Sequence, residues 1–321
     1  MSNISSSAFA DTKAHYDLLD GLRGVAALMV IWYHVFEGYA FAGGGNIETL
    51  NHGYLAVDFF FILSGFVIGY AYDDRWGKSL TMKDFFKRRL IRLHPMVVMG
   101  AVLGAITFCI QGCVQWDGTH VAISMIMLSL LCTIFFIPAM PGVGYEVRGN
   151  GEMFPLNGPC WSLFFEYIGN ILYALFIRRL SNKALTVFVV LLGVALAAFA
   201  VFNVSTYGNI GVGWTLDGVN FLGGSLRMLF PFSLGMLMSR NFKPMKVRGA
   251  FWICTVYVIH YPLMYLFYAW LIENKLYTLG ETWHVAVCVF VLSIVLAYLC
   301  LKLYDEPIRK YLAKRFLGKK R

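Results

Sequence analysis

Charged residues are scarce in this chain. Only 14% of its 321 residues are Asp, Glu, Lys or Arg, while 59% are hydrophobic, and the mean hydropathy is +0.64. Soluble domains carry about 25% charged residues, so this composition excludes a soluble domain and predicts a polytopic membrane protein. The net charge of +9 does not indicate a nucleic-acid partner, because the basic residues are confined to particular loops, as orientation in a membrane requires.

Metal-binding patterns are also missing. The seven cysteines show no CxxC or zinc-like spacing, and most are expected to be small apolar packing residues. The histidines that could ligate a metal are scattered over different segments: His34, His52, His94, His120, His260 and His284. The sequence therefore predicts no metal site and no tightly bound cofactor.

Long apolar runs are what the sequence does contain. Nine stretches are long enough to consider as membrane spans: Leu22–Tyr39, Leu55–Tyr72, Pro95–Ile110, Val121–Ile137, Leu163–Phe176, Ala184–Phe202, Phe221–Met238, Ala250–Leu271 and Val285–Leu303. They leave no soluble domain of useful size. We expect an all-α membrane helix bundle in which residues 1–321 form one domain.

Charge in the loops predicts the orientation. Four segments are rich in Lys and Arg and should lie on the cytoplasmic side: Arg75–Arg92, Arg178–Lys183, Arg240–Arg248 and the chain from Lys302 onward. The loops that should face outward hold one Lys or none: Ala40–Tyr54, Asn203–Asn220 and Glu273–His284. Both termini are then cytoplasmic, with a flexible segment at 1–15 and a basic tail at 306–321. We expect the bacterial plasma membrane, with lipid as one partner.

If all nine stretches crossed the membrane, successive loops would alternate strictly between its two sides. The basic loop Arg178–Lys183 would then lie outside, against the charge pattern. We resolve this by predicting that the stretch from about Val121 to Met140 is re-entrant, since it ends in Pro138 and runs into the Gly-rich loop Gly142–Gly158. Non-helical backbone at membrane depth is tolerated only where protein or water covers it, so this segment should line a cavity. Eight crossings result, with ten as the alternative.

An arginine and a histidine lie within the first apolar stretch. Arg23 and His34 are eleven residues apart, almost three full helical turns, so they share one face of a helix. Ionisable groups in hydrocarbon usually face a bundle interior or a water-filled cavity. A neutral His can act as a general base near physiological pH, and the shared face with Arg23 favours this interpretation of His34 over a hydrogen-bonded core histidine.

The second apolar stretch begins with an acid. Asp58 could orient His34 or bind an acceptor hydroxyl, or it could be a helix-start carboxylate favoured by the helix dipole. Ser64 and Gly65 lie deeper in the same stretch, where a small polar step suits either substrate contact or close helix packing.

A basic cluster precedes the third stretch. Arg88 and Arg92 are one helical turn apart, with Arg89 between them, at the predicted inner surface. Such a fork could hold phosphates, or it could anchor the helix against anionic lipid. The spacing does not separate these two interpretations.

Two later segments place polar groups near one another. Ser162 and Glu166 follow Trp161 at i and i+4, which puts them on one helix face and suggests a polar pocket. Tyr257 and His260 are three residues apart, ahead of a proline. Each of these motifs alone is equally compatible with a structural role.

In order along the chain, six motifs resemble those of the acyltransferase 3 family, over residues 16–311. They are Arg23-x10-His34, Val57-Asp58-x-Phe60-Phe61-x-x-Ser64-Gly65-Phe66, Arg88-Arg89-x-x-Arg92-x-x-Pro95, Trp161-Ser162-Leu163-x-x-Glu166, Tyr257-x-x-His260-x-Pro262 and Glu306-Pro307-x-Arg309. No single motif is decisive, yet six in this order are specific. The chain departs from the family pattern at Ile253-Cys254-Thr255, where relatives often have Ser-Tyr-Ser, and in the short loop Ser239–Gly249, where relatives usually have additional membrane segments.

The resemblance implies an O-acyltransferase that moves an acyl group, often acetyl, from acetyl-CoA or another acyl-CoA to a hydroxyl of an extracytoplasmic glycan or related acceptor. His34 matches the family's catalytic histidine, Arg23 its motif arginine, and the residues from Arg88 to Arg92 the basic stretch attributed to donor binding. Asp58 and Glu166 are the expected catalytic helpers, orienting His34 or the acceptor. The residues expected to contact substrate are Ser64, Trp161, Ser162, Tyr257 and His260.

The mechanism expected from charge placement puts the CoA phosphates against the basic inner surface. No Ser lies in a nucleophile-elbow context, so direct transfer is favoured over a Ser64 acyl-enzyme. A transporter or flippase would also line a cavity with ionisable residues, but no internal repeat with paired broken helices is visible. A non-catalytic binder of lipid or glycan is the further alternative.

Overall fold

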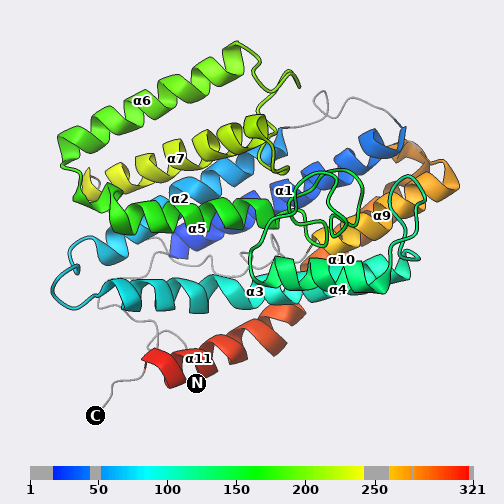
Figure 1. Ribbon diagram of the computed structural model, residues 1–321, viewed down its shortest axis with the longest axis horizontal. Helices are drawn as coiled ribbons and strands as arrows, with labels where there is room; N and C mark the ends of the chain where they lie inside the picture. The colour runs from blue at the N-terminus through cyan, green and yellow to red at the C-terminus, as the bar shows by residue number, and fades with distance from the viewer. Residues whose placement is uncertain (1–16, 44–51, 242–259, 277, 318–321) are drawn as a thin grey trace.

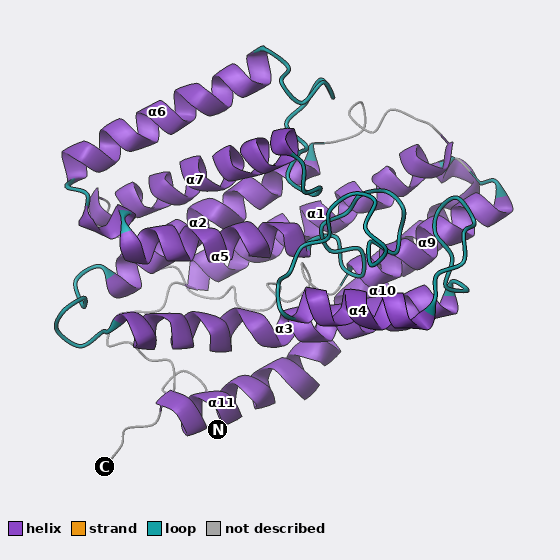
Figure 2. Cartoon of the chain, viewed as in Figure 1, coloured by secondary structure: helices purple, strands orange, loops and turns teal. Residues whose placement is uncertain are grey.

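The computed structural model describes residues 17–43, 52–241, 260–276 and 278–317 of the chain. Within these ranges the protein is built of helices and loops without a named strand (Figure 2). Seven of the described helical segments are long and apolar enough to cross a membrane. The protein is therefore an integral membrane protein, and the prediction of an all-α helix bundle is confirmed.

The helices run roughly alongside one another in Figure 1. They are α1 (Asp17–Gly43), α2 (Ala56–Tyr72), α3 (Met82–Ile110), α4 (Ile123–Ile134), α5 (Cys160–Leu175), α6 (Asn182–Val201), α7 (Gly218–Asn241), α9 (Tyr261–Asn274), α10 (Leu279–Cys300) and α11 (Glu306–Leu317). A π-helical turn, Leu301–Asp305, joins α10 to α11, so the segment predicted as a basic tail is helical as far as Leu317. The predictions for 1–15, for 253–257 and for most of the Ser239–Gly249 loop lie outside the described residues.

Helix α3 differs most from its predicted bounds. It begins at Met82, thirteen residues before the predicted start at Pro95, and Pro95 lies buried in its interior. The start is fixed by Thr81, whose side chain accepts a hydrogen bond from the Asp84 backbone N–H at 3.2 Å. Prolines are tolerated inside membrane helices, so the prediction that Pro95 opens the span was wrong. The basic motif at 88–92 consequently belongs to the spanning helix itself.

Helix α4 is too short to cross a bilayer. Its twelve residues span roughly 18 Å, against a hydrocarbon thickness of about 30 Å. The loop 135–159 follows it, and the second half of this loop, 146–159, is mostly buried. The Leu156 carbonyl lies where a Cβ on Gly104 of α3 would be. Irregular backbone covered by protein is what the re-entrant hypothesis requires.

Helices α2 and α7 pack most closely, because glycines allow their backbones to meet. A Cβ added at Gly65 would overlap the Phe232 carbonyl oxygen, and one added at Gly235 would overlap the Ile62 carbonyl oxygen. The close-packing interpretation of the Ser64-Gly65 step is therefore confirmed for Gly65. Helix α6 covers α7 at one edge of the bundle (Figure 1).

The connections gather at the two ends of the bundle. The loops 111–122, 135–159 and 202–217 lie toward the end at which α1 finishes, whereas α3 begins at the opposite end (Figure 1). Backbone hydrogen bonds tie the loops together, from the Met153 N–H to the Trp214 carbonyl at 2.8 Å and from the Trp116 N–H to the Arg148 carbonyl at 3.2 Å. One end of the bundle thus carries a folded cap of loops.

Candidate active site

A cavity of about 250 Å³ lies beneath this cap. Its walls come from the last turns of α1, from α7 and α9, and from the loops at 150–159 and 211–214. The polar and aromatic residues that line it include Tyr33, His34, Glu37, Glu152, Trp161, Arg227, Tyr261 and Tyr268. His34 and Trp161 are the two predicted site residues among these walls.

His34 is held by a carboxylate on its own helix. Its Nδ1 lies 2.5 Å from Oε2 of Glu37, one helical turn further along α1. When Glu37 is ionised it accepts the Nδ1–H, which leaves Nε2 of the neutral ring as a proton acceptor. The side chains of both residues are partly buried, with 14% of His34 and 32% of Glu37 exposed. The pair has the arrangement of a general base with an orienting acid.

Helix α9 completes the surroundings of this pair. The Tyr268 hydroxyl donates to Oε2 of Glu37 at 3.1 Å and contacts the His34 carbonyl at 2.6 Å, and the Tyr261 hydroxyl donates to the same Oε2 at 3.4 Å. The Tyr261 ring packs edge-on against the imidazole, with ring centroids 4.6 Å apart. Sequence reasoning missed Glu37 and these tyrosines. Two spacings could have indicated them: Glu37 follows His34 by three residues, and Tyr268 follows Tyr261 by seven, so each pair lies on one helix face.

Asp58 has a partner that the sequence did not indicate. Its carboxylate binds Arg227 of α7, with Nε to Oδ1 at 3.0 Å and Nη2 to Oδ2 at 3.3 Å. Arg227 is 1% exposed and also donates to the carbonyls of Val212 and Tyr54. The structure thus contradicts the expectation that Asp58 orients His34. Arg227 was missed, although it is the only ionisable residue in the predicted span Phe221–Met238.

Glu166 is likewise not the partner of His34. It accepts hydrogen bonds at Oε1 from Arg89 of α3 at 2.5 Å and from the Ser64 hydroxyl of α2 at 2.6 Å. None of these three side chains lines the cavity around His34. Arg89 is 3% exposed, so a buried ion pair with a hydroxyl donor joins three helices here. The expectation that Glu166 orients His34 is contradicted, while catalytic roles for Glu166 and Asp58 stay predictions.

The other predicted donor residues lie toward the end of the bundle at which α3 begins. Arg88 and Arg92 form no hydrogen bond or ion pair with any described residue, whereas Arg89 between them is paired. Arg23 lies near the start of α1, about 16 Å along the helix from His34. Of the three arginines of the motif, Arg89 is therefore held in an ion pair. Arg88 and Arg92 make no hydrogen bond or ion pair within the described part of the chain.

Three of the remaining predicted residues lie in the described part of the chain. Ser162 is buried and donates to the Pro159 carbonyl at 2.9 Å, so it helps to begin α5. His260 is fully buried at the start of α9, and its ring lies 5.3 Å from that of His34. Trp161 lies over Arg227, with the guanidinium carbon 5.3 Å from its ring centre. Tyr257 is outside the described residues.

A second carboxyl group reaches the cavity from the loop cap. Glu152 is 6% exposed, accepts a hydrogen bond from Asn150 Nδ2 at 2.9 Å and contacts the Tyr265 hydroxyl. Burial raises the pKa of Glu152 to about 7, against the opposing effect of these hydrogen bonds. The nearby Arg148 guanidinium stacks over the Tyr265 ring at 3.6 Å. Glu152 can therefore gain or lose a proton near neutral pH.

Comparison with known families identifies the chain. A family profile described as "Acyltransferase domain", that of acyltransferase 3, matches residues 16–255. The chain belongs to the acyltransferase 3 family. The resemblance to the family is thereby confirmed, and four of the six motifs, those at 23–34, 57–66, 88–95 and 161–166, fall inside the matched region. The motifs at 257–262 and 306–309 lie beyond it.

Curated relatives of this acyltransferase 3 protein are bacterial. A protein named "Protein 2 in picA locus" from Rhizobium radiobacter is 35% identical over 193 residues, which cover 57% of this chain and 95% of that protein. A peptidoglycan O-acetyltransferase of Listeria monocytogenes is 38% identical over 94 residues, which cover 29% of this chain but only 14% of that protein. No solved structure matches the chain.

Proposed function

We propose that this protein transfers an acyl group, acetyl being the expected one, from acyl-CoA on the cytoplasmic side to a hydroxyl of a glycan on the outer side. The observation that carries the proposal is the hydrogen-bonded pair of His34 and Glu37 in a cavity of an acyltransferase 3 protein. The name of the Listeria relative, a peptidoglycan O-acetyltransferase, supports a cell-envelope glycan as the acceptor.

In the proposed reaction, His34 acts as the general base. Its Nε2 removes the proton of the acceptor hydroxyl while the hydroxyl oxygen attacks the thioester carbonyl. The C–S bond then breaks, an ester forms, and the CoA sulfur leaves with the proton that His34 returns. Glu37 keeps the ring in the productive tautomer and stabilises the imidazolium that forms between the two proton transfers.

The donor proposal rests on the end of the bundle where α3 begins. Arg88 and Arg92 have guanidinium groups without described partners, and Arg23 lies near the start of α1. Free guanidinium groups suit bidentate phosphate binding, and CoA is polyanionic. The described basic segments at 75–92 and 178–183 are also at this end, so the positive-inside rule makes it cytoplasmic.

The experiment that tests this proposal begins with donor binding. The protein is purified in lipid nanodiscs, and acetyl-CoA binding is measured by calorimetry for wild type, Arg88→Ala/Arg92→Ala and His34→Ala. We expect the double Arg variant to lose binding and His34→Ala to keep it. Lys314→Ala/Arg315→Ala is the matched control, because it also removes two positive charges, from exposed positions near the end of α11.

Transfer is then measured with the same proteins. Release of free CoA in the presence of glycan should be lost in His34→Ala, although donor binding is intact. A wild type that binds neither acetyl-CoA nor other acyl-CoAs would contradict the proposal and favour a transporter or a glycan binder. An unchanged transfer rate in His34→Ala would contradict the catalytic role of His34.

A further inference from the structure

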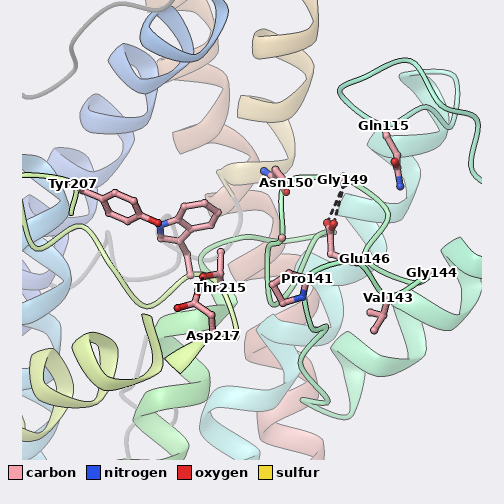
Figure 3. A pocket seen from close by; sticks show the side chains of 13 residues that line it. Gln115, Pro141, Val143, Gly144, Glu146, Gly149, Asn150, Tyr207, Thr215 and Asp217 are labelled. Atoms are coloured by element: carbon pink, nitrogen blue, oxygen red, sulfur yellow. Dashed lines mark hydrogen bonds between the residues drawn. The ribbon is translucent and has the colours of Figure 1, made fainter. Parts of the chain in front are cut away.

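A second, larger cavity opens on the loop cap. Its volume is about 620 Å³, within the roughly 300–1,000 Å³ usual for small-molecule sites. Three loops line it. Gln115 comes from the loop 111–122, several residues between 141 and 151 come from the loop 135–159, and Tyr207, Trp214, Thr215 and Asp217 come from the loop 202–217. In Figure 3, Tyr207 lies on one side and Gln115 on the other, with Asn150 and Pro141 between them. The cavity is therefore assembled by the cap and not by the membrane helices.

Two residues belong to both cavities. Asn150 and Trp214 line the outer cavity and also the cavity around His34. The Nδ2 of Asn150 donates to Glu152, which fixes the orientation of its amide, and its Oδ1 is buried without a hydrogen-bond partner among the described residues. A buried amide oxygen without a donor costs free energy, so a hydroxyl donor from a ligand would fit this point. The two cavities are thus adjacent at Asn150 and Trp214, at a place that has an unused acceptor.

The lining of the outer cavity has a definite chemical character. Its aromatic groups are Trp214 and Tyr207, the latter 48% exposed, and its carboxylates are those of Glu146 and Asp217. No Lys or Arg occurs among the described residues that line it. Although burial acts to raise it, hydrogen bonds from Asn220, Thr215 and Val219 hold the pKa of Asp217 below its usual range, so this carboxylate is ionised near neutral pH.

Glu146 lies near Arg148 and accepts backbone N–H groups, whereas Asp217 forms no ion pair with a described Lys or Arg. An ionised carboxylate such as that of Asp217 disfavours an anionic ligand and can accept a hydrogen bond from a hydroxyl. Gln115 adds an amide side chain that makes no hydrogen bond to any described residue and can both donate and accept. Aromatic rings with a polar edge offer apolar contact area alongside these hydrogen-bonding groups. This combination suits an uncharged ligand with many hydroxyl groups.

We propose that the outer cavity holds the sugar unit next to the unit being acylated, and that the glycan chain passes from it to His34 between Asn150 and Trp214. The inference rests on the proposed function, in that it takes the acceptor of His34 to be a glycan. It adds that the enzyme selects an uncharged oligosaccharide of at least two units.

The test measures binding apart from catalysis. The probes are N-acetylglucosamine oligomers of one, two and four units and, as the anionic comparison, galacturonic acid oligomers of the same lengths. Binding is measured by calorimetry on the full-length His34→Ala protein in nanodiscs, in which the proposed chemistry is disabled but the cap is unchanged. Tyr207→Ala and Gln115→Ala alter opposite sides of the outer cavity, and Trp283→Ala is the control because Trp283 is an exposed aromatic that lines neither cavity.

We expect the neutral dimer and tetramer to bind about tenfold more tightly than the monomer, and each outer-cavity variant to remove most of that gain while leaving monomer binding unchanged. Trp283→Ala should keep the full chain-length effect. A preference of the His34→Ala protein for the anionic series, no dependence on chain length, or no binding of any neutral oligomer would overturn the proposal. If chain-length-dependent binding is lost in the variants but wild type transfers no acyl group, the outer site stands and the proposed reaction fails.

Discussion

The contact between His34 and Glu37 makes a quantitative prediction for Glu37→Gln. Oε2 of Glu37 lies 2.5 Å from Nδ1 of His34 and accepts hydrogen bonds from the hydroxyls of Tyr268 and Tyr261 at 3.1 and 3.4 Å. A glutamine keeps the shape but offers one acceptor oxygen and one NH2 group. If the NH2 faces His34, it donates to Nδ1, moves the ring proton to Nε2 and removes the base. If the oxygen faces His34, the imidazolium loses its neutralising charge.

The magnitude follows from what a general base contributes. Proton transfer by a positioned side chain accelerates reactions by about 10²–10⁴-fold, so we expect Glu37→Gln to lower kcat by about 10²–10³-fold, or roughly 3–4 kcal/mol of barrier. The KM for acetyl-CoA should change little, because Arg88 and Arg92 are at the other end of the bundle. The assay follows release of free CoA with a thiol reagent, using purified protein in nanodiscs and a glycan acceptor.

Two controls separate positioning from general damage. Tyr268→Phe removes one hydrogen bond to the same carboxylate but leaves the His34–Glu37 contact, so its kcat should fall by less than about tenfold. The double variant His34→Ala/Glu37→Gln should be no slower than His34→Ala, since residues that act as a unit are not additive. A Glu37→Gln protein whose kcat lies within about threefold of wild type would refute the reasoning.

Three further predictions concern stability. The pKa of Glu152 is raised to about 7 from the usual 4.5, so the contribution of this group to stability is fully present below about pH 4.5 and is lost as pH rises through 7, by roughly 3 kcal/mol at most. In thermal unfolding in detergent, wild type should lose stability over this pH range relative to Glu152→Gln, and parallel pH profiles of the two proteins would disprove it. Glu166→Met leaves Arg89 buried without its ion-pair partner and should lower the free energy of unfolding by about 3–5 kcal/mol. The double variant Arg89→Met/Glu166→Met should be more stable than Glu166→Met, and the reverse order of unfolding temperatures would contradict this. Gly65→Ala should lower the free energy of unfolding by about 1–3 kcal/mol, because its Cβ meets the backbone of α7. Gly280→Ala should leave stability unchanged, because nothing lies within 4 Å of its Cβ, and equal effects of the two substitutions would count against the packing argument.

Local patterns in the sequence were sufficient for the architecture of the helices. Hydrophobic runs located the described membrane helices within a few residues, apart from the start of α3, where a proline in the helix interior was mistaken for its beginning. The short α4 and the buried loop after it followed from prolines, glycines and charge parity. These features depend on neighbouring residues and on transfer into hydrocarbon, which a linear sequence records directly.

The partners of the polar residues were not predicted correctly from the sequence. Periodicity placed His34 on one face with Arg23, but nothing in the sequence chose between Asp58 and Glu166 as its expected carboxylate partner. Glu37, one turn further along the same helix, was missed. The choice depends on which helices pack together, because Asp58 meets a guanidinium 169 residues away and Glu166 meets one 77 residues away.

The sequence by itself therefore determined that this is a helical membrane protein of the acyltransferase 3 family, with a His in its first helix and a basic cluster in the third. Only the tertiary structure showed that His34 is hydrogen-bonded to Glu37, that α9 supplies tyrosines to this carboxylate, and that the loops form a cap with two adjacent cavities. The physical reason is that helices form from interactions a few residues apart, whereas a site forms from side chains that meet only after the helices have packed.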